Sequence, residues 1–260
     1  NKIPLPTFVA MERWMTAAEA VQLVKSGDRV FLHGSAATPR TLISALLARH
    51  AEMERVELVS ISTLGKLDID RPEVQKSFFV NSLFVSDSVR EVVNGPYGEY
   101  VPVFLSEIPL LFERGILPLD VALVHVSPPD RHGYCTLGVS VDVARSAVRN
   151  AKLVIAQVNP RMPRTHGEGQ VHISSFAALV QVDEPLPEVD YASRIGPEEE
   201  RIGKLCAELI EDRSTLQMGI GAIPDAILWS LRSHKDLGVH MEMCSNGIVE
   251  LLQCGAITNR

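Results

Sequence analysis

Two glycine-rich segments late in the chain hold the residue types and spacing best suited to chemistry. The first reads Gln217-Met-Gly-Ile-Gly-Ala-Ile-Pro-Asp225, and the second, Leu237-Gly-Val-His-Met-Glu-Met-Cys-Ser-Asn-Gly247, contains Glu242. A glycine-rich turn between a strand and a helix lets backbone N–H groups approach a ligand, and the helix N-terminus favours negative charge there. The first segment therefore predicts a site for a phosphate or a developing oxyanion.

Glu242 follows a short apolar stretch that predicts a strand over 238–242. It then falls at the carboxyl end of that strand, where open α/β sheets bind ligands. A carboxylate in this position can act as a nucleophile, as a general base or as an acceptor for a ribose hydroxyl. A solvent-facing or salt-bridged glutamate is the structural alternative. The residues alone leave these interpretations open.

Gly219 and Gly221, with Glu242 about 20 residues later, partly match the fingerprint of dinucleotide-binding turns. Pro224 occupies the place where that fingerprint needs a small residue for close helix packing. A nucleotide-binding module without catalysis is therefore one alternative, and a tight turn without a ligand is the simplest one.

The elements that must position these segments alternate between strands and helices. Short apolar runs predict buried strands at 29–33, 56–61, 78–85, 121–126 and 153–158. Amphipathic stretches predict helices at 39–50, 106–114, 141–150 and 198–211. Thr38 is the expected N-cap of the first helix, with Pro39 in its first turn. Such alternation is typical of open, mainly parallel α/β sheets.

Similar segments occur in the two halves of the chain. Strand 29–33 runs through the Gly34–Pro39 turn into a helix and then a strand at 56–62. The second copy consists of strand 216–218, the Gly219–Pro224 turn, a helix over 225–233 and strand 238–242. This agreement indicates two copies of one unit.

Between the two copies, an acidic, proline-containing stretch at 183–197 marks a boundary. We therefore expect an N-terminal α/β domain over 1–185, a linker over 186–197 and the start of a similar second domain over 198–260. The second domain is expected to be incomplete in this chain, because the first copy takes many more residues.

Composition excludes several classes of protein. The 260 residues carry a net charge of −7 with scattered Lys and Arg, so we expect no nucleic-acid partner. No apolar run approaches the roughly 18 residues of a membrane-spanning helix, and no secretory leader is visible from Asn1 onward. Four cysteines without a CxxC motif predict a cytoplasmic setting, with neither a disulfide framework nor a metal site.

Five segments in order resemble the acetyl-CoA hydrolase and 4-hydroxybutyrate CoA-transferase family, a branch of the class I CoA-transferases. The resemblance extends over nearly the whole chain, and five segments in this order are more specific than any one motif. They are Gly34-Ser-x-x-x-Pro39, Ser127-Pro-Pro-Asp-x-x-Gly133-Tyr, Val158-Asn-Pro-x-Met-Pro-Arg-Thr165, Gly219-Ile-Gly-x-Ile-Pro-Asp225 and Gly238-Val-His-x-Glu-Met243. The resemblance implies two similar open α/β domains.

The resemblance also implies roles for the candidate residues. Glu242 would be the catalytic nucleophile, and Gln217 and His33 would contact the acyl carboxyl group. Coenzyme A would be a substrate, with no tightly bound cofactor and no metal. The backbone of four residues would form an oxyanion hole and bind CoA: Met218, Gly219, Ile220 and Gly221.

The implied reaction moves CoA between a short-chain acyl-CoA and a carboxylic acid through a glutamyl-CoA thioester. Hydrolysis of the acyl-CoA at the same site is one alternative, and an inactive fragment that needs a complementary piece is another. Cys244 and Asn246 depart from the phenylalanine and aspartate expected after the glutamate. The family's later CoA-binding glycine segment is also absent, so the rest of the second domain is an expected partner. Exposed apolar sheet faces would favour a homo-oligomer.

Overall fold

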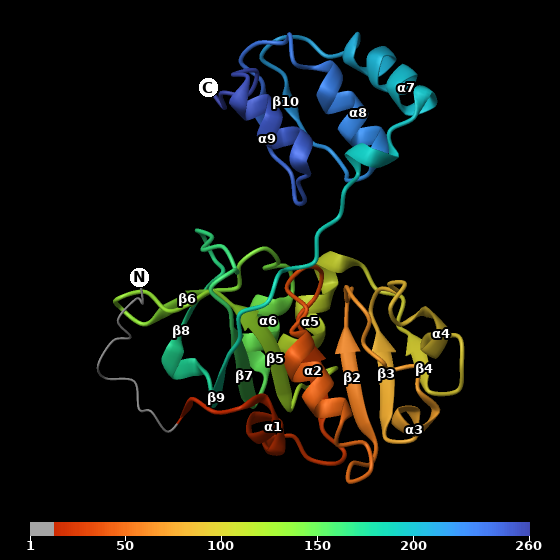
Figure 1. The fold of residues 1–260 in the computed structure, drawn as a ribbon, viewed down its shortest axis with the longest axis vertical. Helices are drawn as coiled ribbons and strands as arrows, with labels where there is room; N and C mark the ends of the chain where they lie inside the picture. The colour runs from red at the N-terminus through yellow and green to blue at the C-terminus, as the bar shows by residue number, and fades with distance from the viewer. Residues whose placement is uncertain (1–12) are drawn as a thin grey trace. The chain divides into compact units, whose positions relative to one another are not determined.

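The computed structural model describes residues 13–260, so the first twelve residues of the expected N-terminal domain lie outside the described residues. The chain divides into two compact units, of which the first ends at Pro187 and the second runs from Glu188 to Arg260 (Figure 1). This division falls inside the segment 186–197 that the sequence analysis treats as a linker.

The first unit is built on a seven-stranded sheet in which every strand pair is parallel. In spatial order the strands are β4 (Gly98–Tyr100), β3 (Phe78–Ser82), β2 (Val56–Ser60), β1 (Arg29–Leu32), β5 (Val121–Val126), β7 (Leu153–Val158) and β9 (Ala178–Gln181). The central strands lie where the apolar runs predict them. The expected α/β fold with a mainly parallel sheet is therefore confirmed.

Residues that alternate along each strand pack into separate cores on the two faces of the sheet. In β1, Val30 and Leu32 belong to one core, whereas Phe31 belongs to the other. In β5, Leu123 faces the first core and Val124 the second. Burial on both faces explains why these strands are continuously apolar in sequence.

Helices cover both faces of this sheet (Figure 1). The first core includes residues of α1 (Ala17–Ala20), α2 (Arg40–Leu47), α3 (Pro72–Gln75) and α4 (Arg90–Val93). The second includes residues of α5 (Ile108–Glu113) and α6 (Ala144–Asn150). Short 3₁₀ turns span Val21–Leu23, Leu105–Glu107 and Ile173–Ser175. A small antiparallel pair, β6 (Tyr134–Thr136) and β8 (Gln170–His172), extends from the loops after β5 and β7.

The second unit contains three helices and one pair of strands around a smaller core. A 3₁₀ turn at Ala192–Arg194 precedes α7 (Pro197–Ala207), β10 (Thr215–Leu216), α8 (Ala222–Ser230), β11 (Gly238–Val239) and α9 (Asn246–Gln253). Its core includes Leu228, Leu231, Leu237 and Leu251, all nearly inaccessible to solvent. Gly203 of α7 lets that helix approach α8 closely, because a Cβ atom there would lie 2.5 Å from the carbonyl oxygen of Ala226.

The two similar segments predicted from the sequence both form β-α-β units with parallel strands. The first β-α-β segment consists of β1, α2 and β2, and the second consists of β10, α8 and β11. The expected boundaries of the second copy are wrong at several points: β10 ends at Leu216 rather than at 218, and α8 ends at Ser230 rather than at 233. α8 begins at Ala222 rather than at 225, since Pro224 fits a first helical turn that needs no N–H from it.

Strand β11 is also shorter than expected: it ends at Val239 and not at 242. The amide of His240 makes the last bond of this ladder, 2.9 Å to the carbonyl oxygen of Leu216. Beyond that point β10 turns away into the glycine-rich loop, so Glu242 has no strand beside it to pair with.

Two helix starts in the first unit also differ from expectation. Pro39, and not Thr38, is the N-cap of α2, because the Thr38 hydroxyl bonds the Ser35 carbonyl oxygen and the Leu64 amide instead. α6 begins at Ala144, because the Asp142 carboxylate accepts the Ala144 amide and stops the helix from extending back to 141.

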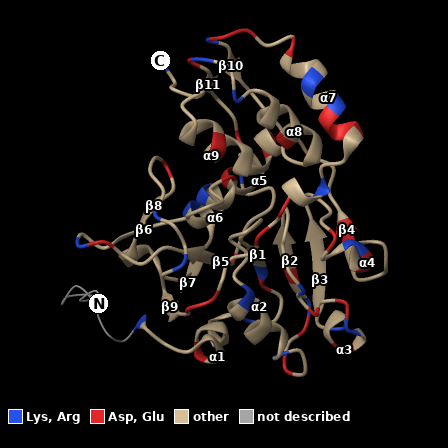
Figure 2. Ribbon diagram, turned by 45° about the horizontal axis from the view of Figure 1, so that its top comes forward, with Lys and Arg blue, Asp and Glu red and all other residues tan. Residues whose placement is uncertain are grey.

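Lys and Arg residues are dispersed among the elements of both units and are interleaved with Asp and Glu (Figure 2). No helix within residues 13–260 is long and apolar enough to cross a membrane.

Candidate active site

The glycine-rich turn and the loop that carries Glu242 leave neighbouring strands at the same edge. β10 and β11 pair in parallel, with Thr215 opposite Gly238 and Leu216 opposite Val239. Gln217 and His240 are the first residues after these strands. The turn over 217–221 and the loop over 240–245 therefore both begin at the carboxyl edge of this pair, where α/β folds place their ligands.

Backbone amide groups of the turn are free to bind a ligand. Within residues 13–260, the amides of Met218, Gly219, Ile220 and Gly221 donate no hydrogen bond. Gly221 is the N-cap of α8 and has φ +126°, a conformation that side-chain-bearing residues rarely adopt. The free amides and the N-terminus of a nine-residue helix make this turn favourable for negative charge.

Glu242 is exposed and forms no ion pair within the described part of the chain. Its neighbours Met243 and Cys244 are exposed as well. Gln217 is also exposed, directly after β10. The second unit thus holds six of the seven candidate residues, and it brings them into two adjacent loops.

The remaining candidate, His33, follows β1 in the first unit and is fully buried. Its Nδ1 accepts the amide of His125 at 3.1 Å, which assigns the proton to Nε2, and Nε2 then donates to the carbonyl oxygen of Ser140 at 2.6 Å. Burial lowers the pKa of His33, so the ring is neutral. With both nitrogens occupied, His33 presents no free ring nitrogen to a ligand in this structure.

Sequence reasoning missed a buried polar network at the start of α2. Gln157 of β7 accepts the amide of Leu42 at 3.3 Å and donates to Glu184 at 2.7 Å. The other oxygen of Glu184 accepts the hydroxyl of Thr41 at 3.0 Å. The signal was present in the sequence, because His125 and Gln157 are polar residues inside apolar runs that predict buried strands.

The turn before α2 differs from its counterpart before α8, since several of its amides donate hydrogen bonds within the first unit. Ser35, Ala37 and Thr38 donate to the carbonyl oxygens of Ser62, Gly34 and Ser35, respectively. Arg40 donates to Thr38, and Leu42 to Gln157. The two β-α-β segments therefore have the same order of elements, but among the described residues only the second leaves four consecutive turn amides unpaired.

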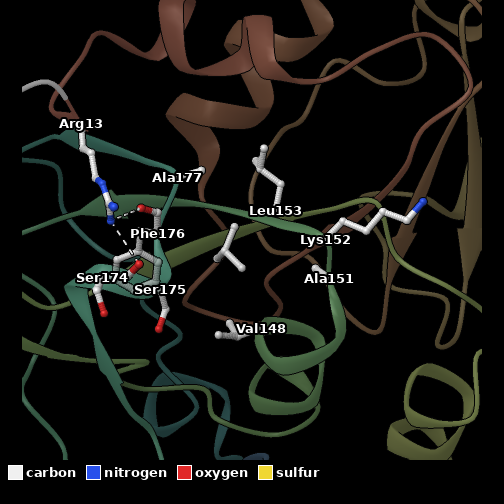
Figure 3. A pocket seen from close by; sticks show the side chains of 10 residues that line it. Arg13, Val148, Ala151, Lys152, Leu153, Ser174, Ser175, Phe176 and Ala177 are labelled. Carbon is white, nitrogen blue, oxygen red and sulfur yellow. Dashed lines mark hydrogen bonds between the residues drawn. The ribbon is translucent and has the colours of Figure 1, made fainter.

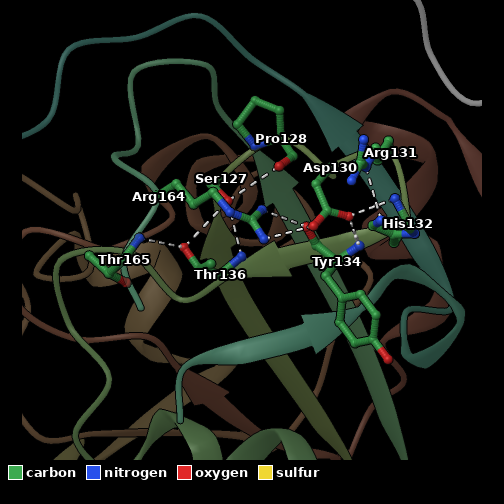
Figure 4. A network of polar contacts seen from close by, with 9 residues as sticks. All are labelled: Ser127, Pro128, Asp130, Arg131, His132, Tyr134, Thr136, Arg164 and Thr165. Atoms are coloured by element: carbon green, nitrogen blue, oxygen red, sulfur yellow. Dashed lines mark hydrogen bonds and ion pairs between the residues drawn. The ribbon is translucent and has the colours of Figure 1, made fainter. Parts of the chain in front are cut away.

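The polar loops after β5 and β7 are joined by a network of contacts (Figure 4). Asp130 accepts the amides of His132 and Tyr134 and pairs with Arg164 at 2.8 Å. The Tyr134 amide and the other bonds to Asp130 hold the pKa of its carboxyl group below the usual value. Thr136 accepts the amide of Thr165 at 3.3 Å. These contacts hold the two loops together, and they pair the polar groups of the loops with one another.

Hollows in the described part of the first unit include one at the start of β7 and β9 and one after β2 and β3. A cavity of about 390 Å³ lies where β7 and β9 begin, and Arg13 closes it by donating to the carbonyl oxygens of Ser174 and Phe176 (Figure 3). A cavity of about 610 Å³ lies after β2 and β3 and is lined by residues 62–65 and 84–90. Three hydroxyl groups in the second cavity bond one another, those of Thr63, Ser86 and Ser88.

Within residues 13–260, no group of three or more His, Cys, Asp or Glu side chains is arranged to hold a metal ion. All four cysteines are free thiols.

The parallel sheet, and the exposed carboxylate in the loop next to a turn with free amides, define an α/β protein with a candidate anion-binding site. The family described as acetyl-CoA hydrolase/transferase N-terminal domain matches residues 10–194. The chain belongs to this family, as the sequence motifs imply.

Relatives named as CoA-transferases match along most of this chain. The chain is 42% identical over 249 residues to 4-hydroxybutyrate coenzyme A transferase of Clostridium kluyveri, covering 96% of this chain and 58% of that protein. It is 44% identical over 246 residues to succinyl-CoA:acetate/propanoyl-CoA:succinate CoA transferase of Fasciola hepatica, covering 93% of this chain and 50% of that protein.

Solved structures agree with the fold. RipA from Yersinia pestis superimposes with a TM-score of 0.89 at 32% identity, covering 95% of this chain and 60% of RipA. The 4-hydroxybutyrate CoA-transferase from Porphyromonas gingivalis gives a TM-score of 0.81 at 36% identity, covering 95% of this chain and 58% of that one. The chain thus spans between half and three fifths of the length of these relatives.

Proposed function

We propose that the protein carrying this sequence transfers coenzyme A between a short-chain acyl-CoA and a carboxylate, with Glu242 as the nucleophile. One observation carries this proposal: an exposed, unpaired Glu242 lies in the loop next to a turn with four unpaired amides. The names of the relatives support the reaction class, since each is called a CoA-transferase.

The proposed reaction has two covalent intermediates. A carboxylate oxygen of Glu242 attacks the thioester carbonyl carbon, the C–S bond breaks, and CoA leaves as a thiolate from an acyl-glutamyl anhydride. The thiolate then attacks the glutamyl carbonyl carbon, which releases the first carboxylate and leaves a glutamyl-CoA thioester. An incoming carboxylate reverses both steps, leaves as the new acyl-CoA and restores Glu242. The thioester energy is retained throughout.

Backbone amides of the 218–221 turn would stabilise the oxyanion of each tetrahedral intermediate. Preorganised donors of this kind each contribute roughly 2.7–4 kcal/mol in other acyl-transfer enzymes. Gln217, exposed at the start of the turn, is proposed to contact the acyl carboxyl group. His33 would act indirectly, because its ring nitrogens hold the backbone at His125 and Ser140.

Trapping the glutamyl-CoA thioester tests this proposal. The complete polypeptide that carries this sequence is incubated with an acyl-CoA and then with borohydride, which reduces the thioester to an alcohol. Peptide mass spectrometry should locate the change at Glu242. Glu242→Ala should lose both the change and the activity, whereas Glu211→Gln, at an exposed glutamate of the same unit, should keep both. Full activity in Glu242→Ala would exclude the proposed nucleophile.

Hydrolysis of acyl-CoA is a second candidate, favoured by the description of the family as hydrolase/transferase. Water would take the place of the incoming carboxylate at one of the covalent intermediates. Release of free CoA with and without added acetate separates the two activities, because only the hydrolase releases CoA in the absence of an acceptor.

We further propose that residues outside this chain complete the CoA pocket and that the protein is a homo-oligomer. Support comes from the lengths of the relatives, which extend beyond the matched region. No tightly bound cofactor is part of the proposal. Comparing the turnover and solution mass of this polypeptide with those of a longer one tests both points.

A further inference from the structure

Both ends of the loop that carries Glu242 are attached to the residues that flank the glycine-rich turn. At the start of the loop, the amide of His240 donates to the carbonyl oxygen of Leu216 at 2.9 Å. At its end, the hydroxyl of Ser245 donates to the carboxylate of Asp225. Leu216 directly precedes the turn and Asp225 lies in the first turn of α8 that follows it. The two loops are thus fixed to each other at both ends.

Asp225 is unusual because its side chain is a carboxylate that is only 2% exposed. Within residues 13–260 it forms no ion pair, and Ser245 supplies the one hydrogen bond to its carboxylate. A buried carboxylate is costly unless it is hydrogen-bonded or lies in a favourable field. Its place in the first turn of α8 supplies that field, since the N-terminal end of a helix favours negative charge.

The contact between α8 and α9 leaves this pair little freedom to move. Gly247, in the first turn of α9, lies so close to α8 that a Cβ atom there would be 2.9 Å from Cδ1 of Leu228 and 3.4 Å from Oδ1 of Asp225. Leu228 itself is only 1% exposed. Ser245 is therefore held against α8 both by its hydrogen bond and by the packing of the helix that it precedes.

We propose that Asp225 and Ser245 are positioning residues for Glu242, an inference that rests on the proposed function. Only Met243 and Cys244 separate Glu242 from Ser245, and both are exposed. Met241 packs against the core directly before Glu242, whereas no core packing fixes the loop directly after it, where the Ser245–Asp225 bond is the nearest fixed point. Reaction rates fall steeply when a reacting group moves by about 1 Å, so loss of the bond should slow attack on the thioester.

Two variants in the complete polypeptide test this role. Ser245→Ala removes the hydroxyl, and Ser245→Thr keeps it. Ser230→Ala is the matched control, since the Ser230 hydroxyl bonds a carbonyl oxygen within α8. For Ser245→Ala we expect kcat, and the rate at which the CoA adduct forms on Glu242 as measured by its reduction with borohydride to the alcohol, to fall on the order of 10- to 100-fold. The KM for acyl-CoA should change much less. Ser245→Thr should recover most of the rate, and Ser230→Ala should match the wild type.

Hydrogen exchange supplies a readout that is independent of the reaction. The amides of His240 and Ile248, which donate to the carbonyl oxygens of Leu216 and Ser245, should exchange faster in Ser245→Ala than in Ser245→Thr or Ser230→Ala. An adduct that forms on Glu242 at the wild-type rate in Ser245→Ala would overturn the positioning role alone. Absence of any adduct on Glu242 in the wild type would instead overturn the proposed function, and this role with it.

Discussion

The Nδ1 atom of His33 accepts the backbone amide of His125 at 3.1 Å, which links the end of β1 to the middle of β5 through a buried imidazole. Both histidines are almost inaccessible to solvent, at 0% and 1% exposure. Their side chains belong to the interior of the sheet, and their protonation is therefore coupled to the stability of the first unit.

Stability should fall as the pH is lowered from 6.5 toward 4. Burial, and then the nearby charge of His33, lower the pKa of His125 from 6.5 to about 4. In this interval the unfolded chain takes up a proton that the folded chain excludes, so unfolding is favoured as the pH falls. Exclusion of this proton by His125 lowers the free energy of unfolding by about 3 kcal/mol near pH 4, since each pH unit below 6.5 removes about 1.4 kcal/mol. Urea unfolding at several pH values measures the slope.

His125→Gln should reduce this slope, and the lowered pKa of His33 should keep it above zero. His166→Gln, at an exposed histidine, serves as the control and should leave the slope unchanged. An identical slope in wild type and His125→Gln would contradict the assignment.

Gln157→Leu should destabilise the first unit. Gln157 is fully buried, and its loss leaves the Leu42 amide and one oxygen of Glu184 without partners. Unpaired buried groups of this kind cost about 1–3 kcal/mol each. The urea midpoint should fall, while Gln181→Leu, at an exposed glutamine of β9, should change it little. Equal midpoints for the two variants would show that the Gln157 bonds contribute nothing measurable.

Gly203→Ala should destabilise the second unit, although alanine is normally favoured over glycine inside a helix by about 1 kcal/mol. The new Cβ would lie 2.5 Å from the carbonyl oxygen of Ala226, and backbone atoms cannot move aside easily. Overpacking of this kind costs roughly 1–3 kcal/mol. Lys204→Ala, at the next and exposed residue of α7, is the control and should be nearly neutral. A rise in melting temperature for Gly203→Ala would rule out the close contact.

Thiol labelling should distinguish the cysteines. Burial raises the pKa of Cys135 to about 12, so this thiol should react only after unfolding. Cys244 and Cys254 are exposed and should react first. Because Cys244 lies two residues after Glu242, acyl-CoA should slow its alkylation more than that of Cys254. Mass spectrometry of peptides after timed alkylation measures all three rates. Rapid labelling of Cys135 in the folded protein would contradict its burial.

Much of the architecture could be predicted because it depends on patterns within short stretches. The apolar runs at Val121–Val126 and Leu153–Val158 form strands with those bounds, since buried parallel strands need apolar residues on both faces. The similar order of elements around the two glycine turns also follows from local residues.

Contacts between distant residues could not be predicted in the same way. Nothing near Leu42 in the sequence indicates that Gln157, 115 positions away, accepts its amide. The end of β11 at Val239 depends on where β10 turns away, and the burial of His33 depends on Ser140 and His125. Such features arise from how the strands are ordered in the sheet, and a single sequence does not specify that order.

The contrast between the two β-α-β turns has a consequence for ligand stoichiometry. Of the four corresponding amides in the turn before α2, those of His33 and Ser35 already donate to the carbonyl oxygens of Leu123 and Ser62, so only two of the four are free among the described residues. An anionic inhibitor that needs four consecutive free amides, as at residues 218–221, would therefore not bind in the same way at the similar turn over residues 34–39. Calorimetric titration should then saturate at one molecule per chain, despite the internal repeat.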